Sequence, residues 1–249
     1  MERAALLRRL TWRTGTVIET IFETPRVKTI SLAVPDWPGH RAGQHVDVRL
    51  TAPDGYQTQR SYSIASGPED QYVSLTVERL EDGEVSPYLV DELRPGDELE
   101  FRGPIGGHFV WTDELGGPLF LVGGGSGLVP LRAMLRHHRA VDSRVPVRVL
   151  CSARSLELLI YREELMKLAA DDLVDISITL TREAPSDWRG YRGRIDPALL
   201  STTGWARNKQ PLTYICGPTA FVETAAAGLV ALGHEPGRIR TERFGGTGV

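Results

Sequence analysis

The chain has 249 residues, of which 41% are hydrophobic and 24% are charged, a composition typical of folded globular proteins. Its formal net charge of −3 at pH 7 leaves no basic excess for nucleic acid, which argues against a nucleic-acid-binding function. No apolar run reaches the roughly 20 residues that a membrane-spanning helix needs, and the N-terminal segment lacks the apolar core of a secretory signal, so we expect a cytoplasmic protein without membrane insertion.

The first half of the chain has the pattern of short strands separated by Gly, Pro and Asp turns. We expect strands at residues 15–24, 27–34, 44–51, 60–66, 71–80 and 97–103. Strands at this spacing are typical of an antiparallel sandwich or barrel. A short helix is expected over 86–93, with Ser86 as its N-cap and Pro87 at its first position.

The pattern changes near Pro118, after a break at residues 111–118. Apolar, β-branched runs without alternation, at 118–124, 145–152, 176–182 and 212–218, indicate strands buried on both faces. Helical patterns at 128–141, 156–170 and 219–233 lie between or after them, as in βαβ units. We therefore predict two domains: an antiparallel β-barrel over residues 1–113, followed by an α/β domain with a parallel sheet over residues 114–249.

A glycine-rich turn, "LVGGGSGLVPL", follows the first strand of the second domain and opens its first helix. Such a turn favours an anion, and a dinucleotide pyrophosphate is an obvious occupant. The turn does not fit G-x-G-x-x-G, because Leu128 or Pro130 stands where the last glycine belongs. A tight turn without a ligand is the alternative interpretation of this segment alone.

The run "QRSYSIAS", residues 59–66, combines an arginine, a tyrosine and several serine hydroxyls. Taken alone, it is either a half-buried strand with polar residues on its wet face or a site for a ligand with both charge and a flat ring. The only cysteines, Cys151 and Cys216, lie far apart, and the six histidines lack zinc-ligand spacing. We therefore expect no metal redox centre in this chain.

The order of three motifs is more specific than any one of them. "RSYS" at the end of a predicted barrel strand, "GGGSGLVPL" after a buried strand and "YICGP" on a later strand follow one another along the chain. In this respect the sequence resembles the ferredoxin–NADP reductase superfamily, particularly its bacterial members related to oxygenase reductases. The resemblance extends from "HRAGQHVDV" to "ERFGG" and implies an FAD-dependent NAD(P)H oxidoreductase, with FMN a less favoured cofactor than FAD.

The resemblance implies that the barrel domain binds the flavin. Arg60 would pair with the flavin pyrophosphate, for which its fork is suited. Tyr62 would stack on the isoalloxazine, and Ser63 would place a hydroxyl near the ring nitrogen that receives hydride. The other residues with an implied flavin contact are Ser61, Val77, Arg79, Glu84, Val85 and Ser86, the last three through the backbone at the start of a short helix.

The resemblance implies that the second domain binds the nicotinamide dinucleotide. The nicotinamide and pyrophosphate would lie on Gly124, Gly125, Ser126, Gly127 and Pro130, and Gly217 and Pro218 are also implied to contact the cofactor. Ser152, Arg154 and Arg182 would hold a 2′-phosphate, which favours NADPH over NADH without excluding NADH. Cys216 would lie near the carbon that gives up hydride, Phe244 would cover the flavin ring, and Glu242 would assist; together with Ser63 these form the implied catalytic set.

Without an iron–sulfur motif in this chain, electrons are expected to pass to a separate acceptor protein, such as a ferredoxin or an oxygenase component. Direct reduction of a diffusible acceptor (free flavin, a quinone or ferric iron) and a non-catalytic flavin- or nucleotide-binding subunit remain as alternatives. Basic residues of the first helix and its loop either help to dock an acidic carrier or form an ordinary solvated face. They are Arg132, Arg136, Arg139 and Arg144.

Overall fold

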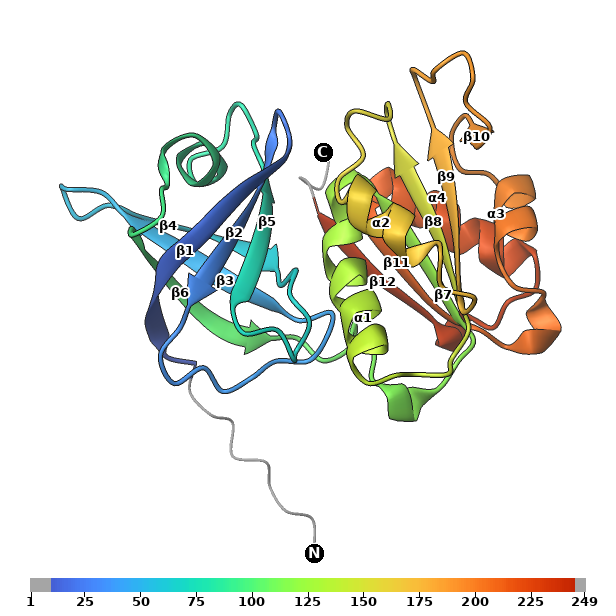
Figure 1. Cartoon of the computed structure of the whole chain (residues 1–249), viewed down its shortest axis with the longest axis horizontal. Coiled ribbons are helices and arrows are strands. Elements are labelled where there is room, and N and C mark those ends of the chain that lie inside the picture. The colour runs from blue at the N-terminus through green and yellow to red at the C-terminus, as the bar shows by residue number, and fades with distance from the viewer. Residues whose placement is uncertain (1–9, 245–249) are drawn as a thin grey trace, which may run out of the picture.

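The computed structural model describes residues 10–244, which form two domains side by side (Figure 1). The first domain holds an antiparallel six-stranded sheet in the order β4-β3-β6-β1-β2-β5. A bridge between Ile64, just after β4, and Leu75 of β5 joins the two edges and closes the predicted barrel. The strands are β1 (Trp12–Thr24), β2 (Val27–Ala33), β3 (His45–Thr51), β4 (Gln57–Ser63), β5 (Val73–Glu78) and β6 (Glu98–Ile105).

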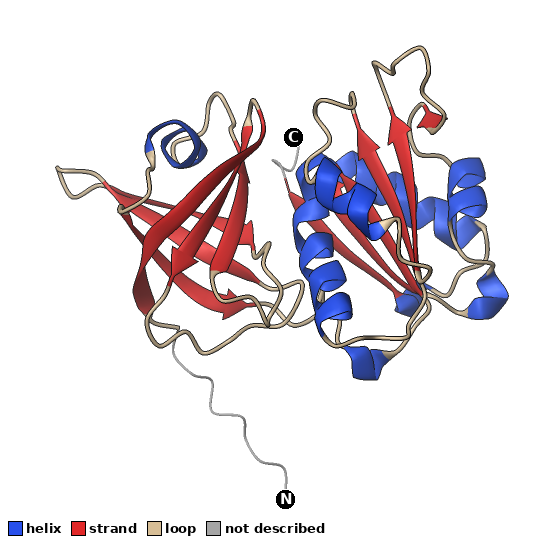
Figure 2. Ribbon diagram, in the orientation of Figure 1, coloured by secondary structure: helices blue, strands red, loops and turns tan. Residues whose placement is uncertain are grey.

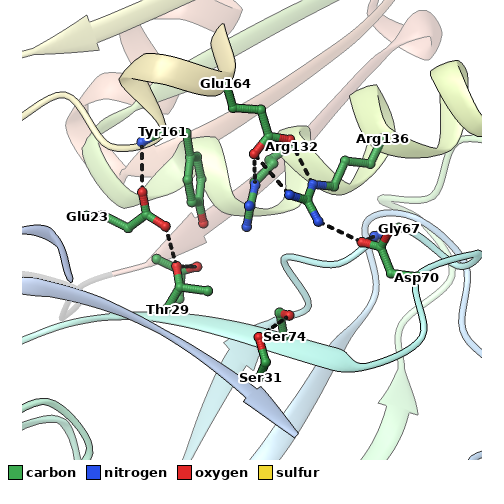
Figure 3. Close-up of polar contacts among 11 residues, drawn as sticks. Glu23, Thr29, Ser31, Gly67, Asp70, Ser74, Arg132, Arg136, Tyr161 and Glu164 are labelled. Atoms are coloured by element: carbon green, nitrogen blue, oxygen red, sulfur yellow. Dashed lines mark hydrogen bonds and ion pairs between the residues drawn. The ribbon is translucent and has the colours of Figure 1, made fainter. Parts of the chain in front are cut away.

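Strand β5 is buried on both of its faces. Leu75 points into the barrel and is fully buried. Ser74 and Thr76 alternate with it and lie on the opposite face, which the second domain covers (Figure 3). Their hydroxyls are satisfied by β2, because Thr76 pairs with Thr29 at 2.8 Å and Ser74 pairs with Ser31 at 3.1 Å.

The second domain is a parallel sheet with helices on both faces, shown in Figure 2. Its strand order is β10-β9-β8-β7-β11-β12. The strands are β7 (Leu119–Gly124), β8 (Val147–Ala153), β9 (Val174–Leu180), β10 (Tyr191–Arg192), β11 (Leu212–Pro218) and β12 (Ile239–Phe244). The helices are α1 (Leu128–Ala140), α2 (Arg162–Leu168), α3 (Pro197–Thr203) and α4 (Thr219–Ala231). The predicted barrel followed by an α/β domain is therefore confirmed.

Each face of the parallel sheet has its own apolar core. Leu131 of α1 and Leu165 of α2 pack on one face, while Leu200 of α3 and Val222 of α4 pack on the other. Burial on both faces explains why β7 reads as an unbroken apolar run in the sequence.

The predicted domain division at residues 113/114 falls between β6 and β7, and it stays a prediction. None of the helices described for residues 10–244 is long and apolar enough to cross a membrane.

Three local predictions differ from the structure. The helix expected over 156–170 is shorter and is confined to α2 (Arg162–Leu168). It cannot begin earlier, because Tyr161 has a left-handed φ of 59° and its N–H donates to Glu23 Oε2 of the barrel at 3.3 Å. The short helix expected over 86–93 is present over residues 86–92, but its turn Tyr88–Glu92 is π-helical and Ser86 does not cap it. Its hydroxyl instead accepts the N–H of Leu80 at 3.0 Å. Strand β10, strand β12 and helix α3 were not predicted.

A cluster of charged side chains joins the domains, and Figure 3 shows its four members: Asp70, Arg132, Arg136 and Glu164. Glu164 of α2 accepts hydrogen bonds from Arg132 Nε at 2.8 Å and from Arg136 Nε at 2.7 Å. Arg136 Nη1 also donates to Asp70 of the barrel domain at 2.8 Å. This interdomain cluster ties α1 and α2 to the loop before β5.

Candidate functional site

The candidate site lies where the carboxyl ends of β7 and β11 meet. From this pair the strand order runs outward in opposite directions, to β8 on one side and β12 on the other, and open parallel sheets bind ligands at such a reversal. Gly123 of β7 is the register partner of Cys216 of β11. A Cβ at Gly127 would collide with the carbonyl of Cys216, so glycine is required for the turn after β7 to lie on β11.

The turn after β7 presents an open backbone surface. Gly125 has a φ of 56°, and nothing lies within 4 Å of the position that its Cβ would occupy. Residues 125–127 form one helical turn that leads into α1, and the first N–H groups of a helix have no intrahelical acceptor. Pro130 is the third residue of α1, where its missing N–H costs no hydrogen bond. The turn therefore fits a diphosphate.

Cys216, which is buried, and Glu242, which is half-buried, lie side by side next to the turn. They are register partners on β11 and β12, and Cys216 is 1% exposed. Burial, with the charge of Glu242, raises the pKa of the Cys216 thiol well above its ordinary value, so the thiol stays protonated at neutral pH. Burial raises the pKa of Glu242 to about 7. Its Oε2 is buried with no hydrogen-bond partner among residues 10–244, which marks a place where a ligand group can complete the site.

Two phenylalanines lie close to this pair of strands. Phe244 ends β12 as the register partner of Pro218 and is partly buried against the core that contains Cys216. The rest of the "ERFGG" segment, from Gly245, lies outside the described residues. A Cβ at Gly124 or Gly217 would come within about 3 Å of the ring of Phe221, at the start of α4. Phe221 was not predicted as a site residue. Its only signal in the sequence is that it is an aromatic residue five positions after Cys216.

On the barrel side, β4 places the side chains of the "RSYS" motif on alternating faces. The Arg60 side chain is 57% exposed, and its Nη2 lies 3.7 Å from Glu84 Oε2. Tyr62 follows on the same face and is half-buried, and burial raises the pKa of its phenol to about 12. Ser61 and Ser63 share the other face, where Ser61 Oγ donates to Asp47 at 2.6 Å. Arg60 and Tyr62 thus present a charge and a ring together.

The second predicted flavin segment offers mostly backbone. Val77 and Val85 are fully buried, so their side chains belong to the barrel core. Arg79 forms an ion pair with Asp91 at 2.7 Å, on the same strand-to-helix corner. Glu84 also accepts hydrogen bonds from two side chains that the sequence did not indicate, Tyr56 at 3.2 Å and Thr58 at 3.0 Å.

The predicted 2′-phosphate residues lie at the ends of two neighbouring strands. Ser152 is near the end of β8 and is 8% exposed, Arg154 follows β8, and Arg182 follows β9. The N–H of Arg182 donates to the carbonyl of Arg154 at 3.0 Å, which holds the two backbones together. Both side chains are exposed, and neither forms an ion pair within the described part of the chain. The pair therefore offers two cations at one edge of the sheet.

One further residue reaches the glycine turn from the barrel. Ser126 Oγ donates a hydrogen bond of 2.8 Å to Glu78 Oε2 at the end of β5. No motif marks Glu78 in the sequence, because its partner is distant along the chain and in the other domain. The contact joins the end of barrel strand β5 to the turn after β7.

Comparison with known proteins supports both domains. Residues 16–111 match the family model of an oxidoreductase FAD-binding domain, and residues 121–227 match that of an oxidoreductase NAD-binding domain. The chain is 38% identical to ferredoxin–NADP reductase B of Sorangium cellulosum over 184 residues, covering 71% of this chain and 73% of that protein.

Two further relatives extend the similarity along the chain. The glycine betaine monooxygenase reductase subunit of Pseudomonas aeruginosa is 31% identical over 247 residues, which is 95% of this chain and 66% of that subunit. The FAD/NAD-binding domain of nitric oxide dioxygenase from Vibrio cholerae has a TM-score of 0.83 at 25% identity, covering 94% of this chain and 99% of that one. The chain thus spans about two thirds of the length of the oxygenase reductase subunit.

The barrel, the parallel sheet and the two matched domains define an FAD-dependent oxidoreductase that uses a nicotinamide dinucleotide. The chain belongs to the ferredoxin–NADP reductase superfamily, as its three motifs indicated.

Proposed function

We propose that this protein accepts a hydride from NADPH, with NADH as the alternative donor, and passes the electrons through FAD to a separate electron carrier such as a ferredoxin or an oxygenase component. One observation carries the proposal. At the strand-order reversal of the parallel sheet, an open glycine turn, a protonated buried thiol and a carboxyl with one buried, unpartnered oxygen lie together, and the turn contacts the end of barrel strand β5.

Bound FAD supplies the ability to accept two electrons together and to release them one at a time. The residues proposed to hold it are Arg60 and Tyr62, whose charge and ring share one face of β4. Arg60 would exchange its 3.7 Å contact with Glu84 for a diphosphate, since a guanidinium pairs more strongly with a doubly charged oxygen cluster. Ser63, at the end of β4, is proposed to place its hydroxyl at the flavin edge.

On the other side, the chain's task is to hold the nicotinamide and exclude water. Cys216 is proposed to pack against the nicotinamide as a neutral thiol, because its raised pKa rules out a thiolate at neutral pH. Glu242 is proposed to offer its unpartnered oxygen to the ligand and to hold a proton at that atom below about pH 7. Phe244 is proposed to cover the flavin ring, where the nicotinamide would lie, when no nucleotide is bound.

The donor preference depends on the edge of the sheet. Arg154 and Arg182 offer two cations where the adenosine ribose is expected, and Ser152 adds a hydroxyl. A 2′-phosphate carries the charge that such a pair can bind. This supports NADPH as the preferred donor.

The acceptor is proposed from the relatives, because an oxygenase reductase subunit and a ferredoxin reductase both align with this chain. The docking role considered for the basic residues of α1 is not supported for Arg132 and Arg136, since both are paired with Glu164 in the interdomain cluster. Arg139 and Arg144 are exposed and remain available to an acidic carrier.

Anaerobic stopped-flow reduction of the FAD-loaded protein by NADPH and by NADH tests the donor. Steady-state oxidation of the better donor is then measured with a panel of ferredoxins against ferricyanide, quinones and free flavin. Fast flavin reduction with ferredoxin as the best acceptor is expected. Preference for a quinone, free flavin or ferric iron would contradict the carrier, and a flavin that neither nucleotide reduces would indicate a non-catalytic subunit.

A further inference from the structure

We propose that Glu78 restrains dinucleotide binding at the glycine turn and so sets the affinity of this protein for NAD(P)H. Its carboxylate is held on the turn by the 2.8 Å hydrogen bond from Ser126 Oγ. The inference rests on the proposed binding of NAD(P)H at that turn. It goes further by naming a barrel residue, outside the nucleotide-binding domain, as a competitor of the dinucleotide.

The competition follows from the number of donors. A serine hydroxyl has one proton to donate, and Ser126 gives it to Glu78. The pyrophosphate of a dinucleotide is expected at the same turn, where the helix dipole and free N–H groups of α1 favour an anion. Ser126 cannot donate one proton to the carboxylate and to a phosphate oxygen at once, so a phosphate that takes this hydroxyl displaces Glu78 from it.

Charge acts in the same direction. Glu78 is exposed at the end of β5, and within residues 10–244 it forms no ion pair. Its neighbour Arg79 does not compensate it, because that guanidinium is paired with Asp91 at 2.7 Å. The carboxylate therefore remains beside the turn after it is displaced and repels the phosphates. Near the dielectric constant of water, one such charge pair at contact distance changes a binding constant by about fivefold.

The restraint has a use in a reductase that turns over. Tight binding that is uniform along the reaction lowers KM without raising kcat. Weaker binding of the dinucleotide therefore costs nothing in kcat, and it lets the oxidised nucleotide dissociate faster. Glu78 also makes this restraint specific to ligands that carry a phosphate at the turn. It should not affect a ligand that occupies only the arginine pair at the ends of β8 and β9.

The test uses the FAD-loaded protein and the isosteric variant Glu78→Gln, which keeps an oxygen for Ser126 but loses the charge. Glu81→Gln is the matched control, because Glu81 lies on the same segment but is 71% exposed and pairs with Arg26 at 3.2 Å. Calorimetry gives the Kd of NADP⁺, which has the pyrophosphate, and of 2′-AMP, which has the ribose 2′-phosphate without it. Each titration is repeated at about 1 M salt, where the Debye length is about 3 Å.

We expect Glu78→Gln to lower the Kd of NADP⁺ about fivefold at low salt and by less at high salt, with 2′-AMP and the Glu81→Gln control unchanged. An unchanged or weaker NADP⁺ affinity in Glu78→Gln would overturn the inference while leaving the proposed function intact. An equal gain for 2′-AMP would also overturn it, because it would reveal a general charge effect. Failure of wild-type protein to bind NADP⁺ and NAD⁺ would remove the proposed function and this inference together.

Discussion

Glu164→Gln should loosen the joint between the two domains. Glu164 receives hydrogen bonds from Arg132 Nε at 2.8 Å, Arg136 Nε at 2.7 Å and Arg136 Nη2 at 3.1 Å. Burial alone would raise the pKa of this carboxyl, but the hydrogen bond from Arg136 and the charges of both arginines outweigh burial and hold it below its ordinary value. The carboxylate is therefore the charged centre of the interdomain cluster.

The magnitude follows from burial. Removing one partner of a fully buried ion pair costs about 3–5 kcal/mol. Here the Glu164 side chain is 26% exposed and that of Arg136 is 33% exposed, while Arg132 is only 12% exposed. Solvent screening at Arg136 lowers the expected loss to about 2 kcal/mol. For a chain of this size such a loss shifts the Tm by roughly 4–8 °C.

The assay is thermal unfolding of the FAD-loaded protein, followed by flavin fluorescence and by circular dichroism. Glu163→Gln is the control, because Glu163 is the preceding residue on α2, is exposed and forms no ion pair within the described residues. A carboxyl whose folded pKa is lowered adds stability above its unfolded pKa of about 4.3 and loses it as the pH falls through the folded value. The difference between wild type and Glu164→Gln should thus be full at pH 7 and narrow below about pH 4. A Tm shift equal to that of Glu163→Gln would refute the reasoning.

Three further outcomes are expected. Arg60→Ala should raise the Kd of FAD about tenfold, measured by fluorescence titration of the apoprotein, because an exposed phosphate-pairing arginine is lost; unchanged affinity would remove the phosphate assignment. Cys216→Ala should slow flavin reduction about tenfold in stopped flow with little change in nucleotide Kd, whereas Cys151→Ala, also buried, should leave the rate unchanged. The pKa of Glu242 in the folded protein is raised to about 7, so the stability of wild type relative to Glu242→Gln should fall as the pH rises from about 4.5 to about 7. Denaturant titrations at several pH values measure this difference in unfolding free energy. A difference that does not change with pH would contradict the burial of the Glu242 carboxyl.

Local patterns in the sequence were sufficient for the fold and for the glycine turn. Strand β7 has an unbroken apolar run because both of its faces are covered, and that run predicted a parallel sheet. Gly125 and Gly127 were predicted to belong to a ligand-binding turn. In the structure Gly125 has a left-handed φ, and Gly127 must be a glycine because its backbone lies against β11. The apolar run and the cluster of glycines are local features of the sequence, whereas the contact of Gly127 with Cys216 joins positions far apart in the chain.

Features that depend on tertiary contacts could not be predicted in this way. The expected helix over 156–170 is shortened at Tyr161, whose N–H meets Glu23 of the barrel. Ser86 looked like a helix cap, but its hydroxyl bonds to Leu80 in the corner after β5. Strand β12 was missed because its sequence, "IRTERF", is charged, and Glu242 is half-buried only by its place beside β11. Such contacts are set by the surrounding fold, whether the partner is six positions away, as for Ser86, or in the other domain, as for Tyr161, and no spacing rule predicts them.

Two of the contacts between the domains, the Ser126–Glu78 hydrogen bond and the interdomain cluster, differ in strength, and this difference bears on how a nucleotide can enter. Helix α1 begins beside Ser126, whose bond to Glu78 is exposed, and about ten residues later it carries Arg136 of the partly buried interdomain cluster, roughly 15 Å away. An exposed contact contributes about 0–1 kcal/mol, at most half of the value expected for the cluster. A dinucleotide can therefore displace Glu78 while the cluster still holds the domains together. Glu78→Gln should accordingly shift the Tm by no more than about 2–4 °C, half of the shift expected for Glu164→Gln or less, and an equally large shift in both variants would show that the two contacts contribute equally to stability.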